Sequence, residues 1–276
     1  AMVLGTTSIS VFADETGTVS PDWDADGSAK VFAYGTDANG GFTLYADTLT
    51  KALNEIYKKT PTGTTTIECK PGEDVGSMQH GHVADDLVIN GNGAYVSGGE
   101  YDLEIDTYTY DRTKGTNVDS NKSELTKDIN VTVNNLNQIA AWGERRSNVT
   151  INLKFNGCKD MNRVYFSGNT GINNITITDC SFSDKTGGSS SNTSIYSNAK
   201  GQINLDNVSF TNVAVPINLK NKSDGTQTIN VKNCNFTNCA TAEIAKKTGS
   251  TLYAAPIRVV TEGSAKASNV TVSSCT

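Results

Sequence analysis

Three aromatic residues, Trp142, Tyr165 and Tyr196, each stand between residues that are small or apolar. Sugar rings stack on flat aromatic faces, so a line of such side chains on a repetitive protein indicates a carbohydrate-binding surface. Polar residues close in sequence could form its rim: Arg145, Arg163 and Asn198. A competing interpretation is that segments 183–192 and 240–252 cover the rings, which would then serve local packing.

The stretch DWDADG at 22–27 is similar to the opening of a calcium-binding loop. It supplies carboxylates at alternate positions: Asp22, Asp24 and Asp26. The bidentate Glu that closes such a loop is absent, because Ala33 occupies its place, and no helical pattern flanks the stretch. The stretch is therefore either a Ca²⁺ site or a solvated acidic turn. The sequence suggests no cofactor other than Ca²⁺.

The only histidines, His80 and His82, alternate along the chain, so on an extended segment both rings point the same way. Asp85 or Asp86 could complete a metal site with them; an unliganded pair is the alternative. Further on, GGEYDLEID places four carboxylates on one strand face, which indicates a wet outer surface: Glu100, Asp102, Glu104 and Asp106.

A short phrase recurs with a period of about 22 residues: ITITDCSF begins at 175, INLDNVSF at 203 and INVKNCNF at 229. The same alternation of apolar residues begins at Ile67, Leu87, Val131, Leu153 and Val270. Alternation predicts strands, and each strand is too short to bury its own face. Successive units must therefore stack about 4.8 Å apart, as in a solenoid.

Stacking places like residues in columns. Phe182, Phe210 and Phe236 form an inward aromatic stack, while Asn, Asp or Gly before each turn allows the left-handed backbone of a sharp corner. Four of the six cysteines share one inward column: Cys158, Cys180, Cys234 and Cys275. We favour buried thiols there, and disulfides are the alternative that an even count suggests.

The stretch DTLTKALNEIYKKTPTG has helical periodicity and predicts one amphipathic helix that caps the open end of the stack before the first strand. Residues 1–13 are similar to the tail of a secretory signal peptide, an N-terminal strand being the alternative, and 14–46 form an irregular segment. The net charge of -6 argues against nucleic acid as a partner, and no run is suited to membrane insertion.

The helix, then GTTTIECKPGE, VINGNGAYVSGG and the repeated units at 47–276 resemble the right-handed parallel β-helix of the pectin-lyase-like proteins, and more narrowly exported β-helix proteins of Gram-positive bacteria. The resemblance implies an all-β solenoid with one capping helix. The sequence stops within a repeat at Cys275-Thr276, so we expect it to be a fragment of a longer surface protein. It implies no single function, since the fold carries polysaccharide lyases, hydrolases and adhesins. The hydrolase signatures are absent or out of order, and Arg145, Arg146 and Arg163 are the only hint of a lyase.

The leading interpretation is therefore a non-catalytic, monomeric, secreted or cell-surface protein that binds a polysaccharide or a host glycan, as an adhesin does. A polysaccharide lyase or glycoside hydrolase with an unfamiliar site is the first alternative. A passive stalk that projects other domains is the second.

Overall fold

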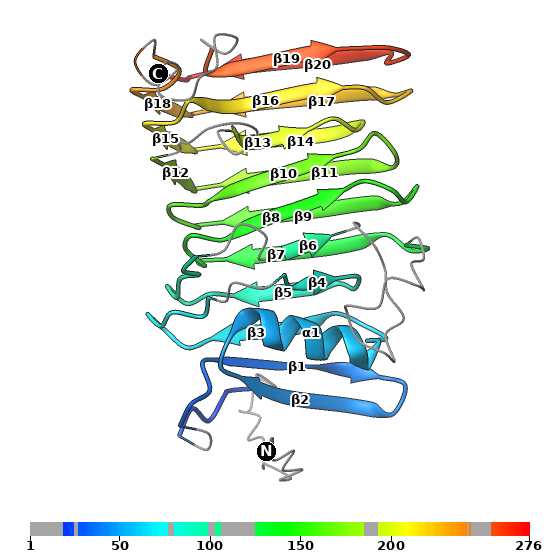
Figure 1. Ribbon diagram of the computed structural model, residues 1–276, viewed down its shortest axis with the longest axis vertical. Helices are drawn as coiled ribbons and strands as arrows, with labels where there is room; N and C mark the ends of the chain where they lie inside the picture. The colour runs from blue at the N-terminus through cyan, green and yellow to red at the C-terminus, as the bar shows by residue number, and fades with distance from the viewer. Residues whose placement is uncertain are drawn as a thin grey trace.

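The computed structural model describes residues 19–24, 27–76, 80–98, 103–105, 125–184, 193–241, 243 and 255–276. Strands predominate, and they stack one above another along a single long axis (Figure 1). The segment 1–13, for which we predict a signal-peptide remnant, lies outside the described residues.

The strands belong to three sheets. The ten-stranded sheet has the order β2 (Gly40–Ala46), β1 (Val31–Asp37), β3 (Thr65–Cys69), β5 (Leu87–Asn90), β7 (Ile129–Asn134), β9 (Thr150–Asn156), β11 (Ile172–Thr178), β14 (Gly201–Asp206), β17 (Thr226–Lys232) and β20 (Ala267–Ser273). The seven-stranded sheet has the order β19 (Ile257–Thr261), β16 (Val215–Asn221), β13 (Thr193–Ser197), β10 (Arg163–Ser167), β8 (Ala140–Glu144), β6 (Leu103–Ile105) and β4 (His82–Val83). The third sheet contains β12 (Ser181–Ser183), β15 (Ser209–Thr211) and β18 (Asn235–Thr237).

The chain passes through these sheets in a fixed order. Each strand of the ten-stranded sheet from β3 to β17 is followed by one strand of the seven-stranded sheet, and from β11 onward a short strand of the third sheet lies between them. We call one such pass a layer. All pairs are parallel except those that β1 makes with β2 and β3. Long parallel sheets stacked in this way are compatible with a β-helix-like solenoid.

The expected columns are present in the interior. Phe182, Phe210 and Phe236 occupy matching positions in β12, β15 and β18. Their rings stack with centroids 5.3 Å and 5.1 Å apart and planes within 6° of parallel. Phe182 and Phe210 are fully buried. The aromatic stack predicted from the repeat is therefore confirmed.

The corners also follow the sequence. The residue before the inward leucine, cysteine or valine has positive φ in successive layers, at 49° to 67°: Asn135, Gly157, Asp179, Asn207, Asn233 and Ser274. The second corner has the same geometry at Asp184, Asn212 and Asn238. There the Asn212 amide donates to Asp184 and the Asn238 amide donates to Asn212, at 2.9 Å and 2.7 Å. The corner residues thus satisfy each other's polar groups from layer to layer.

The predicted helix is α1 (Leu49–Lys59), which buries Leu49, Ala52, Leu53 and Ile56. Thr48 is its N-cap, because the Thr48 hydroxyl accepts the Lys51 backbone N–H, while the Asp47 carboxylate pairs with the Lys51 ammonium. Among the described residues, no helix combines the length and apolar character needed to cross a bilayer.

The expectation of an irregular segment at 14–46 is wrong for residues 31–46. These residues form an antiparallel hairpin, β1 and β2, and β1 also pairs with β3. The turn contains Asn39 followed by Gly40, a pair that favours tight hairpins. The Asn39 backbone N–H donates to the Asp37 carboxylate in this turn. Val31 and Ala33 are fully buried, so packing under α1 stabilises the hairpin.

Candidate functional site

A single line of side chains crosses the outer face of the seven-stranded sheet. Strand pairing puts seven residues in register, one from each strand: His82, Glu104, Trp142, Tyr165, Tyr196, Asn218 and Arg258. We call this set the outer column. Their neighbours along each strand point inward, as Val164 and Phe166 do on either side of Tyr165. The column therefore brings together Trp142, Tyr165 and Tyr196, as the sequence predicted.

The tyrosines at the centre of the outer column contact each other face to face. The rings of Tyr165 and Tyr196 are 4.5 Å apart at their centroids with an interplanar angle of 15°. The Arg163 guanidinium lies 5.6 Å from the Tyr165 ring centroid. One face of each tyrosine ring is covered by the other ring, so a sugar could stack only on the opposite face of either ring.

At β16 and β19 the outer column ends with the amide of Asn218 and the guanidinium of Arg258. Arg258 Nη1 donates to Asn218 Oδ1 at 2.9 Å. Asn218 is buried and Arg258 is half-buried. This bond holds the Arg258 side chain across the last two strands and places hydrogen-bond donors at that end of the column.

The opposite end of the outer column holds a buried carboxylate between two imidazoles. Glu104 is only 8% exposed; its Oε2 lies 2.8 Å from Nδ1 of His80 and 3.6 Å from Nδ1 of His82. The His80 ring also meets the edge of Trp142, with centroids 6.4 Å apart. Glu104 is thus not part of a wet acidic face. Its three expected companions, Glu100, Asp102 and Asp106, lie outside the described residues.

The carboxylates expected beside the histidines have other hydrogen-bond partners. Asp85 accepts from the Lys127 ammonium at 2.9 Å, and Asp86 accepts from the Asn130 backbone N–H at 2.8 Å. In the part of the chain that the structure describes, no group of three His, Cys, Asp or Glu side chains is arranged to hold a metal ion. Glu104, from a strand too short to recognise in the sequence, takes the position next to both imidazoles.

Burial of His82 has a consequence for stability. Desolvation lowers the pKa of its imidazole below the ordinary 6.5, although the Glu104 charge opposes this and His80 adds to it. At pH values between the lowered and the ordinary pKa, the unfolded chain binds more protons at His82 than the folded protein does. The folding stability that neutral His82 contributes above pH 6.5 is therefore lost as the pH falls.

We therefore expect the urea midpoint to drop between pH 7.5 and pH 5.5, a window that spans the ordinary His pKa. His82→Gln should reduce this drop, and unfolding followed by tryptophan fluorescence measures it. His80→Gln is the comparison variant and should keep most of the drop, because desolvation of His82, rather than the His80 charge, is the largest cause of the lowered pKa. An identical drop in wild type and His82→Gln would contradict the assignment.

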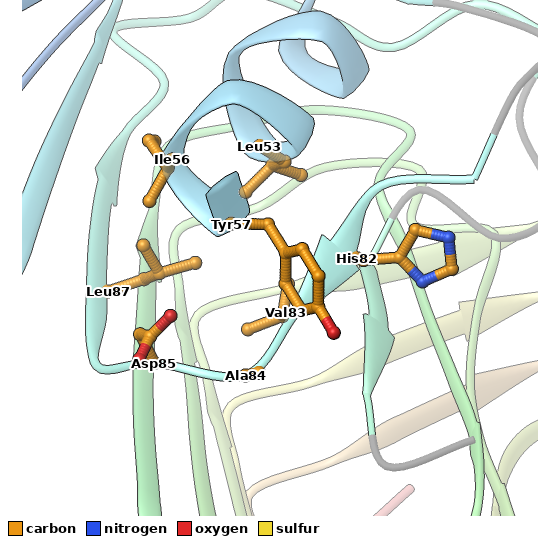
Figure 2. A pocket seen from close by; sticks show the side chains of 8 residues that line it. All are labelled: Leu53, Ile56, Tyr57, His82, Val83, Ala84, Asp85 and Leu87. Carbon is orange, nitrogen blue, oxygen red and sulfur yellow. The ribbon is translucent and has the colours of Figure 1, made fainter. Parts of the chain in front are cut away.

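Figure 2 shows a small hollow beside His82, between α1 and the segment that leads from β4 to β5. Leu53, Ile56 and Tyr57 line it from the helix. Val83, Ala84, Asp85 and Leu87 complete the wall. The lining is mostly apolar, and the Tyr57 and His82 rings lie 6.0 Å apart. The packing of these side chains therefore attaches α1 to the first layers, and the mostly apolar hollow is unsuited to a polar polymer.

The predicted rim residues separate in the structure. Arg163 lies on the outer face beside Tyr165, whereas Arg145 turns away, donates to the Val149 carbonyl oxygen and is buried against Gly171. Asn198, just after β13, is buried, and its Oδ1 has no hydrogen-bond partner among the described residues. Arg145 therefore holds a connection between layers. Arg163 is buried, as Asn198 is, so ligand contact by either residue stays a prediction.

The acidic stretch near the N-terminus lies apart from the outer column. Asp22 and Asp24 are exposed, and the Asp22 carboxylate accepts the Asp24 backbone N–H at 3.1 Å, as in a polar turn. Asp26 lies outside the described residues. Calcium binding there stays a prediction.

The sequence did not predict that His82 and Glu104 belong to the outer column. β4 has two residues and β6 has three, so neither shows the alternation that marks a strand. The segment with His80 and His82 and the later Leu103-Glu104-Ile105 triplet occupy matching positions in adjacent layers. Neither segment shows this by itself, because only the pairing of His82 with Glu104 relates them. Fold and site thus define a mostly parallel β protein with a polar and aromatic line along one sheet. The chain matches no protein-family model, no curated protein and no solved structure.

Proposed function

We propose that this protein is a non-catalytic, secreted or cell-surface right-handed parallel β-helix that binds a carbohydrate chain along the outer column. The single observation that supports this most is the register of seven polar and aromatic side chains on one sheet face. Such a line runs along the stacking axis with one side chain about every 4.8 Å. It suits a long, narrow, polar ligand better than a compact one.

The chemistry of the outer column favours a sugar polymer among such ligands. Trp142 offers an apolar ring, the tyrosines carry hydroxyls, and the half-buried Arg258, which buried Asn218 holds in place, offers a guanidinium. Sugars present apolar ring faces and many hydroxyls, so they use both kinds of contact. The chain's negative net charge disfavours a nucleic acid, the other common rod-like polymer.

We expect Trp142→Ala and Tyr165→Ala each to weaken binding of the best ligand from a glycan array by about tenfold, or about 1.4 kcal/mol. Isothermal titration calorimetry measures the affinity of each variant. Tyr95→Ala is the matched control, because Tyr95 is an exposed aromatic residue outside the outer column. Unchanged affinity in both column variants, or no glycan bound by the wild type, would overturn the proposal.

A polysaccharide-cleaving enzyme is the second candidate, favoured by the contact between Glu104 and His80. An imidazole held by a buried carboxylate is a plausible general base. Hydrolases of glycosides use two carboxyl groups, and within the outer column Glu104 supplies one. Release of reducing ends or unsaturated uronates from a polysaccharide panel, abolished by Glu104→Gln, would favour the enzyme. Absence of both activity and binding would leave the passive stalk.

A further inference from the structure

The inward cysteine column has an order that the sequence count alone does not reveal. Backbone bonds connect each member to the layer above: Ser181 N–H donates to the Cys158 carbonyl, and Thr276 N–H to that of Cys234. The same bonds run through Val208, so the column reads Cys158, Cys180, Val208, Cys234 and Cys275. Two pairs of adjacent cysteines are therefore separated by one valine.

Within each pair the two cysteines occupy the same corner in adjacent layers. Cys180 Sγ accepts the Cys158 backbone N–H at 3.3 Å. The Cys234 carbonyl oxygen accepts the Thr276 N–H at 3.0 Å, which places Cys275 directly over Cys234. Paired parallel strands lie about 4.8 Å apart, within the Cα separation of about 4.4–6.8 Å that a disulfide spans. Both side chains of a pair point inward from the same corner.

The remaining cysteines have other neighbours. Cys69 pairs with Val31 of β1, and Cys239 follows β18 with its thiol donating to the Phe210 carbonyl oxygen. Val208 separates Cys180 from Cys234. Each cysteine of the column thus has one cysteine partner, and the many pairings that six cysteines allow reduce to a single pattern.

We propose that Cys158–Cys180 and Cys234–Cys275 are two disulfide sites that staple adjacent layers when the protein meets an oxidising compartment, while Cys69 and Cys239 remain thiols. The compartment, though not the pairing, rests on the proposed extracellular function. The oxidant is a small-molecule disulfide such as oxidised glutathione.

The reaction proceeds by thiol–disulfide exchange. During refolding, before the pair is buried, one of its thiols, for example Cys180, attacks the glutathione disulfide as a thiolate. It displaces one glutathione thiolate and forms a mixed disulfide. Cys158 then loses its proton and attacks the Cys180 sulfur, which breaks the mixed disulfide and releases the second glutathione. Two protein thiols are oxidised, and one glutathione disulfide is reduced to two thiols.

The two sites differ in access. Cys158 and Cys180 are buried beneath further layers, whereas Cys275 is half-buried in the last layer that the structure describes. Oxidised glutathione should therefore link Cys234 to Cys275 in the folded protein. It should link Cys158 to Cys180 when present during refolding.

The test is to refold the full chain in a glutathione redox buffer, alkylate remaining thiols under denaturing conditions, and map the peptides by mass spectrometry. We expect two linked peptide pairs and alkylation at Cys69 and Cys239 alone. Cys275→Ser, a change at a half-buried position, should add Cys234 as a third alkylated thiol, and Cys180→Ser should add Cys158. Six alkylated thiols, or a link between Cys234 and its near neighbour Cys239, would overturn the pairing.

The same mapping on protein purified from its natural source separates the two proposals. Linked pairs there support both the pairing and an oxidising location. Free thiols there, with linked pairs after refolding, would uphold the pairing and contradict export. The glycan measurements do not depend on either result.

Discussion

Phe210→Ala is expected to lower the free energy of unfolding by about 3–5 kcal/mol, the cost of truncating a fully buried phenylalanine. Phe210 is 0% exposed and stacks on Phe182 below and Phe236 above. Its removal leaves a cavity between the rings of Phe182 and Phe236. Strands β12 and β18, which each pair with β15, hold these two rings in place. Urea unfolding followed by circular dichroism measures the loss.

Phe236→Ala is the matched control for this prediction. Phe236 is partly exposed and has one stacking partner, so its truncation should cost about half as much. Because a layered protein can unfold locally, the loss at Phe210 should also appear as faster amide exchange in the neighbouring layers. Equal costs at the two positions would show that the rings do not act as a stack.

Gly143→Ala should destabilise the protein by about 3 kcal/mol or more, at the upper end of overpacking costs. A Cβ at this inward position of β8 would overlap the Ile105 carbonyl oxygen and lie 3.0 Å from the Phe166 ring. The first contact is with backbone, so β6 must move away from β8. Since β6 carries Glu104 and β8 carries Trp142, glycan affinity should fall together with stability.

Gly63→Ala provides the comparison for Gly143→Ala. An added Cβ there would meet only the Thr36 hydroxyl, at an ordinary 3.5 Å, and should change the urea midpoint little. If both variants unfold at the wild-type midpoint, the close packing of β6 against β8 is wrong. If Gly143→Ala loses stability but keeps full glycan affinity, the His80 and Glu104 end of the outer column is not part of the ligand site.

Much of the architecture could be predicted because each layer repeats a local pattern. The alternation around Ile177, Leu205 and Val231 identified strands, and the Asp or Asn before each turn identified left-handed corners. Both signals depend on a few adjacent residues, so they are visible without tertiary structure. The hairpin at 31–46 was missed because its strands repeat no phrase from the layers.

The candidate site was predicted only in part. Register alone placed Trp142, Tyr165 and Tyr196 in one line, and the structure agrees. Ring orientation depends on side-chain packing, so the stacking of Tyr165 on Tyr196 could not be foreseen. The direction of Arg145 likewise depends on a carbonyl group that folding brings near, that of Val149.

The sequence by itself determined the repeat, the inward columns and the corners, because these follow from side-chain polarity and backbone preference within one unit. Only the tertiary structure decided that Glu104 lies between two histidines and beside Trp142. Such contacts join residues from different layers across insertions of unequal length. Their partners are chosen by the stacking of layers, which no single segment encodes.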